Sequence, residues 1–289
     1  MKNDRIILCP NVGRDLDFEM TRKVGEILKG HGRRVDFCPI FDDDSAVAAA
    51  PPGYTSAKLE DAVNFAEMII TFGGDGTILR AARTAACKGV PILGINTGGK
   101  GFMAELETKD IETIGAVAKG EYNVEHRMML DVGIIRDGET VCSDFALNDI
   151  VIKGENKVIE LTLYGDGQRI YHFSGDGAVI ATPTGSTAYS LSAGGPIVEP
   201  SAQNIIVTPI CAHALEAKPY VLVADRHVSV EIGCRKHNPV HISVDGYEPI
   251  GIQWGDIISV RKSRKYTNLV RLLHKSFYCK VNEKLGEKV

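Results

Sequence analysis

Apolar runs rich in β-branched residues alternate with amphipathic segments over the first third of the chain. Such alternation is typical of a parallel sheet with helices on both faces. We expect strands at 5–10, 34–40, 68–72 and 90–96, and helices at 15–29, 56–66, 78–88 and 109–119. Ligands of such sheets bind at the carboxyl ends of the strands, so the segments after the third and fourth strands are the first places to look for a site.

The pattern changes at about Tyr122, where short strand-like runs replace the helices. Turn signals recur at 137–138, 153–156 and 165–167. Short strands at close spacing predict an antiparallel, mostly β unit. The fold class is therefore α/β plus all-β, with a Rossmann-like parallel-sheet domain at 1–121 followed by an antiparallel β-rich domain at 122–267. The basic, partly apolar tail 268–289 is expected to pack back on the first domain.

Composition and charge exclude several classes of protein. The chain has 289 residues and a mass of 31.3 kDa, with 44% hydrophobic and 24% charged residues, which is ordinary for a soluble protein. A formal charge of −4 argues against a nucleic-acid binder, because such proteins normally have a basic face. No apolar run approaches the roughly 20 residues of a membrane-spanning helix, and the first residues show no secretory signal pattern.

The cysteines and histidines give no sign of a metal site. The seven cysteines are scattered, odd in number and without a Cys-x-x-Cys pair. Most lie in apolar runs, which predicts reduced thiols in the core and a cytoplasmic location. His237 and His241 are four residues apart, but Pro239 between them does not fit the helix that would bring an i, i+4 pair of metal ligands together. The acidic run Asp42-Asp43-Asp44 is better explained as a solvated loop than as a metal site.

The turn Gly73-Gly74-Asp75-Gly76-Thr77 joins an apolar strand directly to a helix. Glycines at such a turn let backbone N–H groups approach a phosphate, and the helix N-terminus favours negative charge. A carboxylate in the middle of this turn needs another explanation, because it repels phosphates. We interpret the turn as a phosphate-binding loop that carries a base, placed to deprotonate a hydroxyl group.

A second dense segment runs from Thr182 to Ser192 and carries seven hydroxyl side chains around a Pro and a Gly. Short donors and acceptors together with the ring of Tyr189 suit a nucleoside, which has ribose hydroxyls and a base to stack. A Ser/Thr-rich surface loop is the alternative. The apolar strand and the Asp176-Gly177 pair that precede the segment favour a site.

The adjacent pair Asn148-Asp149 interrupts an otherwise apolar strand. Burying an amide and a carboxylate without partners would cost a few kcal/mol. A β-bulge or edge position with both groups solvated is one explanation. The functional explanation is that both side chains face a cleft and bind ribose hydroxyls.

Taken together, these motifs resemble the NAD kinase family over roughly residues 5–260. The matching elements are Gly73 to Thr77, Asn96-x-Gly98-x-x-Gly101-Phe102, Leu147-Asn148-Asp149, Asp176-Gly177, Thr182 to Tyr189, and Asp245-Gly246, in the family's order and spacing. The Gly-Gly-Asp-Gly turn is shared with diacylglycerol, sphingosine and phosphofructokinase relatives, whereas the threonine-proline motif is far more specific. The implied activity is phosphorylation of NAD by ATP to give NADP.

The resemblance implies a catalytic role for Asp75 as the acceptor of the proton from the adenosine ribose 2′-hydroxyl. Gly73, Gly74, Gly76 and Thr77 would shape the loop around the phosphates of the dinucleotide and the donor. The γ-phosphoryl group is highly anionic, so the reaction needs in-line positioning and Mg²⁺ or another divalent cation, which we expect to be carried by the ATP phosphates. No Walker-type motif is present in the sequence, so this is not a P-loop kinase.

The resemblance also implies where NAD binds, in a cleft between the two domains. Asn148 and Asp149 would contact the ribose and adenosine region, and Asp176 would bind near the nicotinamide end. Adenine and ribose would be held by Thr184, Thr187, Ala188, Tyr189, Ser190, Leu191 and Ser192. Lys157 and Tyr247 lie where relatives have ligand-contacting side chains, and Asp245 belongs to the matching Asp245-Gly246 motif. A homodimer or homotetramer built through the β domain is also implied.

Two departures from the family pattern concern cations. Relatives often have Arg at the position of Ser174, and a second Arg at the position of Lys218 in the turn that begins at His213. Lysine lacks the bidentate geometry of arginine, so a phosphate contact there would be altered, although a structural turn is the simpler interpretation.

Two other functions share some of these features. A lipid kinase of the diacylglycerol type has the same glycine-rich turn, but it would need an apolar acceptor pocket, and the hydroxyl-rich segment 182–192 argues against one. A silent dinucleotide sensor would more naturally lack the base, and Asp75 is present.

Overall fold

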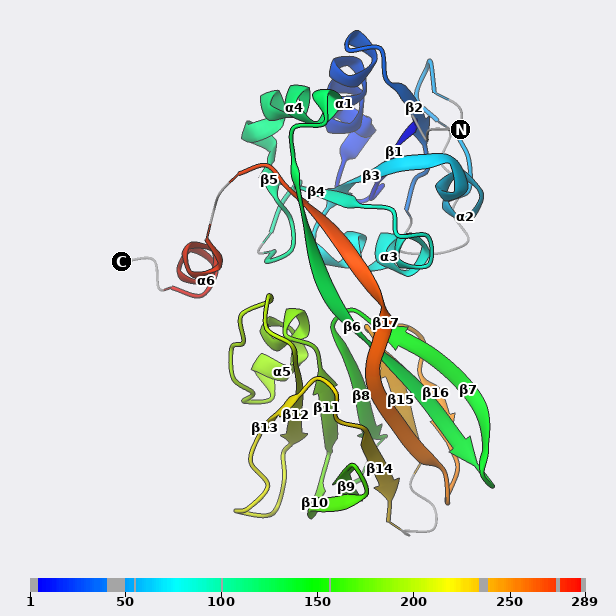
Figure 1. The fold of residues 1–289 in the computed structure, drawn as a ribbon, viewed down its shortest axis with the longest axis vertical. Coiled ribbons are helices and arrows are strands. Elements are labelled where there is room, and N and C mark those ends of the chain that lie inside the picture. The colour runs from blue at the N-terminus through cyan, green and yellow to red at the C-terminus, as the bar shows by residue number, and fades with distance from the viewer. Residues whose placement is uncertain are drawn as a thin grey trace. The chain divides into compact units, whose positions relative to one another are not determined.

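The computed structural model describes residues 5–40, 50–54, 56–99, 101–155, 157–233, 239–273 and 276–286. The acidic run 42–44 lies outside these residues. Contacts divide the chain into two compact units, Met1–His126 with Lys265–Val289, and Arg127–Arg264. Two long strands, β6 (Asn123–Arg136) and β17 (Ile257–Arg271), have residues in both units (Figure 1).

The first unit contains the predicted parallel sheet. Its strands are β1 (Arg5–Pro10), β2 (Arg34–Phe37), β3 (Ala66–Gly73), β4 (Ile92–Asn96) and β5 (Leu106–Glu107). They pair in parallel in the order β2-β1-β3-β4, with β5 and Leu269 of β17 also on β4. The helices are η1 (Leu16–Phe18), α1 (Glu19–Gly30), α2 (Leu59–Ala62), η2 (Val63–Phe65), α3 (Asp75–Ala86), η3 (Thr108–Thr113), α4 (Ile114–Lys119) and α6 (Phe277–Leu285). The Rossmann-like expectation is confirmed.

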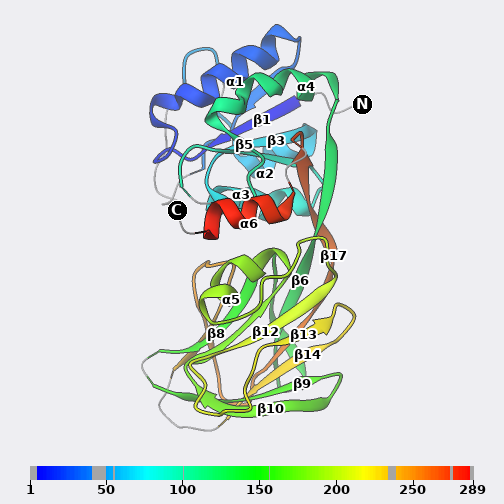
Figure 2. The ribbon, with the colours of Figure 1, turned by 90° about the vertical axis from the view of Figure 1, so that its left-hand side faces the viewer.

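Helices cover both faces of this sheet, as Figure 2 shows. Val24 of α1 and Val117 of α4 pack in one buried cluster with Leu93 and Ile95 of β4. The opposite face of β4 belongs to α3, because a Cβ built on Gly94 would lie 2.6 Å from Cδ1 of Ile78. A glycine on β4 therefore lets α3 approach closely and sets the start of that helix against the strand ends.

Several element boundaries differ from the sequence expectation. The predicted helix 56–66 contains only α2 and the 3₁₀ turn η2, and its last residue already belongs to β3. Helix α3 begins at Asp75, three residues earlier than expected, with Gly74 in an extended N-cap conformation. The early start matters for chemistry, because the carboxylate then stands in the first turn of the helix, near its positive end.

The second unit is a pair of antiparallel layers, as predicted. One layer has the order β13-β12-β11-β8-β15-β16, and the other contains β10-β9-β14-β17 with β6 and β7 beside them. The bounds are β7 (Glu139–Ala146), β8 (Asp149–Gly154), β9 (Ile159–Gly165), β10 (Gln168–Gly175), β11 (Gly177–Ala181), β12 (Asn204–Ile210), β13 (Tyr220–Val223), β14 (Val228–Ile232), β15 (Val240–Val244) and β16 (Ile250–Ile252). A 3₁₀ turn, η4 (Thr184–Thr187), and a short helix, α5 (Tyr189–Ser192), follow β11.

The two layers enclose one apolar core. Ile150 and Ile180 from one layer and Leu163 and Val228 from the other are fully buried in the same cluster. The predicted turns at 137–138 and 165–167 are hairpin turns, with positive φ at Asp137 and at its following glycine. Positive φ at both central positions matches the twist of the flanking strands.

The expectation about cysteines is only partly right. Six cysteines lie in the described residues and all six are free thiols. Cys9 and Cys38 are buried, as expected, but Cys87, Cys211 and Cys279 are exposed. These three lie at a helix end, a turn and a helix surface, where apolar neighbours in sequence do not imply burial. No helix in the described part of the chain is long and apolar enough to cross a membrane.

Candidate active site

The glycines of the 73–77 turn occur there for two different structural reasons. A Cβ on Gly73 would lie 2.1 Å from Oγ1 of Thr77, so only glycine fits where β3 passes into α3. A Cβ on Gly74 or Gly76 would meet nothing within 4 Å. Those two glycines therefore leave open space over the start of α3, where backbone N–H groups and the helix dipole favour an anion.

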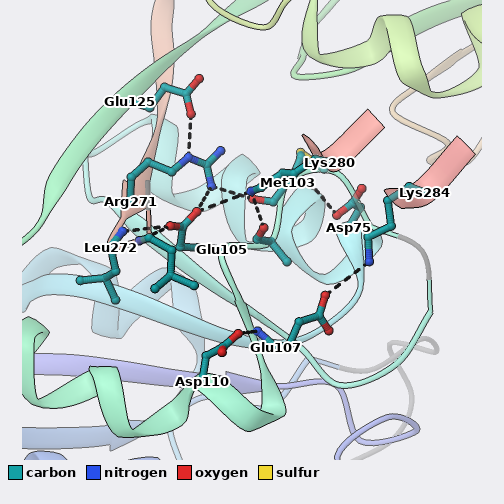
Figure 3. A network of polar contacts seen from close by, with 12 residues as sticks. Asp75, Met103, Glu105, Glu107, Asp110, Glu125, Arg271, Leu272, Lys280 and Lys284 are labelled. Atoms are coloured by element: carbon teal, nitrogen blue, oxygen red, sulfur yellow. Dashed lines mark hydrogen bonds and ion pairs between the residues drawn. The ribbon is translucent and has the colours of Figure 1, made fainter. Parts of the chain in front are cut away.

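The carboxylate of Asp75 is held in one orientation by a neighbouring loop (Figure 3). Its Oδ2 accepts the N–H of Phe102 at 2.7 Å, and its Oδ1 accepts the N–H of Met103 at 3.1 Å. A Cβ on Gly101 would come within 2.7 Å of Oδ1, so the loop backbone can approach the carboxylate only because that residue is glycine. Asp75 is half-buried. Each oxygen keeps lone-pair capacity for one more partner.

The segment after β4 forms a tight loop beside this turn. The side chain of Asn96 donates to the carbonyl of Gly99 at 3.1 Å and to Glu107 at 2.9 Å, and its oxygen accepts the N–H of Gly98. The N–H of Thr97 donates to the carbonyl of Gly73 at 3.4 Å. The hydroxyl of Thr97 is buried with no hydrogen-bond partner among the described residues, which marks it as a group that a ligand could satisfy.

In the second unit, Asp245 organises the segment that carries Asn148 and Asp149. One carboxylate oxygen of Asp245 accepts the N–H of Leu147 at 2.8 Å, and the other accepts those of Asn148 at 2.7 Å and Asp149 at 3.1 Å. Asp245 itself has a φ of +50° in the turn with Gly246, between β15 and β16. A single side chain thus fixes three consecutive amides that lie almost a hundred residues away in sequence.

Asp149 is buried, with 5% of its surface exposed. Burial first and the charge of Asp245 second raise the pKa of its carboxyl group to about 7, although the N–H of Tyr189 opposes both. The carbonyl of Asn148 accepts the N–H of Thr182 at 2.9 Å, while its side-chain Oδ1 is buried with no partner in the described structure. The pair is therefore neither a solvated edge nor a satisfied core.

The hydroxyl-rich stretch is a compact turn rather than a surface loop. Thr182 donates to the carbonyl of Leu147 at 2.5 Å, and Ser186 donates to that of Pro183 at 2.7 Å. The buried hydroxyl of Ser190 lies 2.9 Å from that of Thr208. These groups hold the turn together.

Other expected contact residues of this stretch lie nearer the surface. Tyr189 is 37% exposed, Ser192 is exposed, and Thr187, Ala188 and Leu191 are half-buried. The structure therefore separates the stretch into hydroxyls that build the turn and an outer side that remains accessible to a ligand.

Arg127 is a residue whose importance the sequence reasoning missed. It is 5% exposed, and its Nη1 donates to the hydroxyl of Thr184 at 3.2 Å. A cation directly before the apolar run that starts at Met128 was the available signal, because an arginine is rarely buried without a specific partner.

The structure does not bring all the expected NAD contacts together. Asp149 pairs with Ala181 at one end of β11, whereas Asp176 precedes the other end, roughly 17 Å away along the strand. Lys157 follows β8 and is exposed at the same end as Asp176. Tyr247 is half-buried in the turn after β15, at the Asp149 end.

The turn that departs from the family pattern borders a cavity of about 530 Å³ in the second unit. Its lining includes Ala193, Gly194, Pro209, Cys211, His213 and Lys218. The cavity lies between the end of α5 and the segment after β12. The turn is thus not merely a connection, because it forms one wall of a space next to the hydroxyl-rich stretch.

Comparison with known proteins agrees with this geometry. Residues 11–122 match the model of the ATP-NAD kinase N-terminal domain, and residues 147–272 match that of the ATP-NAD kinase C-terminal domain. The chain is 36% identical over 277 residues to an NAD kinase of Acetivibrio thermocellus, covering 95% of this chain and 94% of the relative. It is 37% identical over 281 residues to an NAD kinase of Natranaerobius thermophilus, covering 96% of each.

Two solved structures are similar in fold. Yeast NADH kinase complexed with NADH superposes with a TM-score of 0.82 at 26% identity, covering 100% of this chain and 89% of the other. An NAD kinase from Archaeoglobus fulgidus in complex with ATP superposes with a TM-score of 0.72 at 27% identity, covering 97% and 98%.

Proposed function

This chain belongs to the ATP-NAD kinase family, whose reaction is the ATP-dependent phosphorylation of NAD, and we propose that Asp75 takes the proton from the adenosine ribose 2′-hydroxyl during the transfer. The single observation that carries this proposal is the carboxylate of Asp75, oriented by two backbone amides at the start of α3. A ribose hydroxyl is a poor nucleophile, so a correctly placed base lowers the barrier.

The phosphate side of the reaction is proposed to use the open space over Gly74 and Gly76. Backbone N–H groups at the start of α3 would face the transferred phosphoryl group, and the positive helix end would offset its charge. Base and anion site are therefore built from one strand-to-helix turn.

The NAD side is proposed to be the segment of Asn148 and Asp149. The unpartnered Oδ1 of Asn148 is an acceptor for a ribose hydroxyl. The pKa of about 7 lets the Asp149 carboxyl group both donate and accept near neutral pH. Thr187, Tyr189 and Ser192 on the outer side of the turn would contact the adenosine. Asp176 and Lys157 would contact NAD at the opposite end of β11.

A divalent cation such as Mg²⁺ fits this donor set only as a companion of ATP. Among the described residues, no group of three or more His, Cys, Asp or Glu side chains could hold a metal ion. Mg²⁺ binds proteins through one or two carboxylates together with substrate phosphates and water, and it neutralises charge on the transferring group. We therefore propose that ATP brings the ion.

We also propose that the chain forms a homodimer or homotetramer through its β unit. Strand β13 is an edge strand, and its Tyr220, Val221 and Val223 are 41%, 48% and 57% exposed. An exposed apolar edge strand is a typical interaction surface. Light scattering after size exclusion would measure the mass, and a monomer at all concentrations would contradict the proposal.

A cytoplasmic location is proposed on the basis of the thiols. All six described cysteines are free, and Cys9 and Cys38 are neighbours in the core without a disulfide. Proteins of oxidising compartments usually pair such residues. Cell fractionation that recovered the protein outside the cytoplasm would contradict this.

The variant Asp75→Asn tests the role of the base. Asparagine keeps one oxygen for the amides of the 101–103 loop but cannot take a proton, so we expect kcat to fall by about 10²–10⁴ while NAD still binds. NADP formation and calorimetric NAD affinity are the measurements. Asp36→Asn, which removes a carboxylate paired with Arg5 in the same unit, is the matched control. Wild-type turnover in purified Asp75→Asn would refute the role.

A further inference from the structure

The loop that orients Asp75 is itself held by groups from the C-terminal part of the chain (Figure 3). Phe102 and Met103 donate to Asp75, and the carbonyl of Met103 accepts Nη1 of Arg271 at 3.0 Å. The carbonyl of Ala104 accepts Nζ of Lys280 at 3.0 Å. The two carbonyl groups that follow these amides, those of Met103 and Ala104, are therefore each held by a cationic side chain.

Glu105 binds the same two cationic side chains. Its side chain is 1% exposed and lies 3.1 Å from Arg271 and 3.5 Å from Lys280. Its other oxygen accepts the N–H groups of Leu272 at 3.0 Å and Leu273 at 2.6 Å. The buried carboxylate of Glu105 thus has four donors. Turning the carboxylate would break some of these contacts and leave its charge uncompensated, so it is held in one orientation.

The network also balances its charges. Arg271 donates through Nε to Glu125 at 2.7 Å, so two carboxylates face two cations. Helix α6 contributes Lys280 and, one turn later, Lys284, which pairs with Glu107 at 3.3 Å. Figure 3 shows both lysines extending from α6 toward the 101–107 segment. Of the two lysines, Lys280 contacts the loop next to the amides on Asp75, whereas Lys284 contacts Glu107.

We propose that Glu105, Arg271 and Lys280 are positioning residues that fix the 101–105 loop and through it the orientation of the Asp75 carboxylate. The proposal rests on the role of Asp75 as the base. Proton transfer requires the acceptor within hydrogen-bond reach of the hydroxyl, and a misplacement of about 1 Å can cost 10²-fold in rate. The last helix of the chain thereby acts on a catalytic group that lies some 200 residues earlier.

Lys280→Met in the full-length chain tests the proposal. We expect kcat to fall about tenfold, with the KM values for NAD and ATP changing less than about twofold, because the carboxylate loses its orientation while the substrate sites are untouched. Lys280→Arg retains the cation and is expected to recover most of the rate. Lys284→Met removes a lysine from the same face of α6 and is the matched control with wild-type kcat.

Hydrogen exchange gives a readout that does not depend on turnover. The amides of Phe102 and Met103 should exchange several-fold faster in Lys280→Met than in Lys284→Met. Glu105→Gln is the second variant, and it carries the test if Lys280→Met is poorly folded. It should show the same increase in amide exchange and the same loss of kcat. Wild-type kcat and exchange in both variants would overturn the proposal, as would an equal loss in Lys284→Met.

The outcome is separable from that for the base itself. If Asp75→Asn retains full turnover, the role of Asp75 fails, and the catalytic meaning of the network fails with it. If Asp75→Asn is inactive while Lys280→Met and Glu105→Gln keep the wild-type rate, the base stands and the positioning network alone is refuted.

Discussion

The carboxylate of Asp245 has two effects that one substitution can separate. It accepts three amide hydrogens from the 147–149 segment, and its charge raises the pKa of Asp149. In Asp245→Asn, one oxygen can still accept from Asn148 and Asp149, but the new amide group faces the N–H of Leu147, which brings two donors together. The variant therefore loses one buried hydrogen bond and one negative charge.

The hydrogen-bond effect is largest at low pH. A buried donor without an acceptor costs about 1–3 kcal/mol, so we expect the free energy of unfolding to drop by about 2 kcal/mol at about pH 5. Asp149 is protonated there, since burial first and Asp245 second raise its pKa to about 7. The charge of Asp245 then has little to repel.

The charge effect appears as the pH rises. Between about pH 4 and pH 7 the folded chain keeps a proton on Asp149 that the unfolded chain has released, so the stability from this group is complete below pH 4 and is lost as the pH rises toward 7. Asp245→Asn should lower this pKa. Each unit by which the pKa falls is worth about 1.4 kcal/mol, so the penalty at about pH 8.5 should be smaller than at about pH 5 in proportion to the change in pKa.

Urea unfolding followed by circular dichroism at the two pH values measures both effects. Asp166→Asn is the matched control, because Asp166 is also a positive-φ residue before glycine, but it is exposed and pairs with Arg226. Asp166→Asn should lose much less free energy of unfolding, and its loss should not become smaller from about pH 5 to about pH 8.5. An equal loss at both pH values in Asp245→Asn would refute the proposed action on Asp149, and no loss at either would refute the hydrogen-bond argument.

Two further predictions concern the same unit. Gly185→Ala should weaken NAD binding at least tenfold by calorimetry, because its Cβ would lie 2.1 Å from the carbonyl oxygen of Asn148; Gly251→Ala, whose Cβ would meet nothing within 4 Å, should not. The two hydrogen bonds from Arg136 hold the pKa of Asp256 below its ordinary value, so this pair should stabilise the fold above about pH 4 and lose that effect as the pH falls further. Acid unfolding of Asp256→Asn should lack this component, and an unchanged acid transition would contradict the assignment.

The sequence alone determined the features that depend on local chemistry. Alternation of apolar strands and amphipathic helices predicted the parallel sheet, and the change of pattern near Tyr122 predicted the β unit. The glycine-rich turn could be located because steric limits act on the residue itself: Gly73 has no room for a Cβ against Thr77. The motifs then identified the family.

Local patterns could not predict which distant groups meet. The amides of 147–149 find Asp245 only because β8 and β15 are neighbours in the sheet. Asp149 and Asp176 lie at opposite ends of β11, a separation that the sequence pattern does not show.

The same limit applies to two further features of the site. The sequence shows that the 182–192 segment is rich in hydroxyls, but only tertiary packing shows that those of Ser186 and Ser190 help to close a turn. The support of Asp75 by Lys280 joins segments about 200 residues apart. Periodicity reports which face of an element is buried, and it carries no information about the partner, which chain topology and close packing decide.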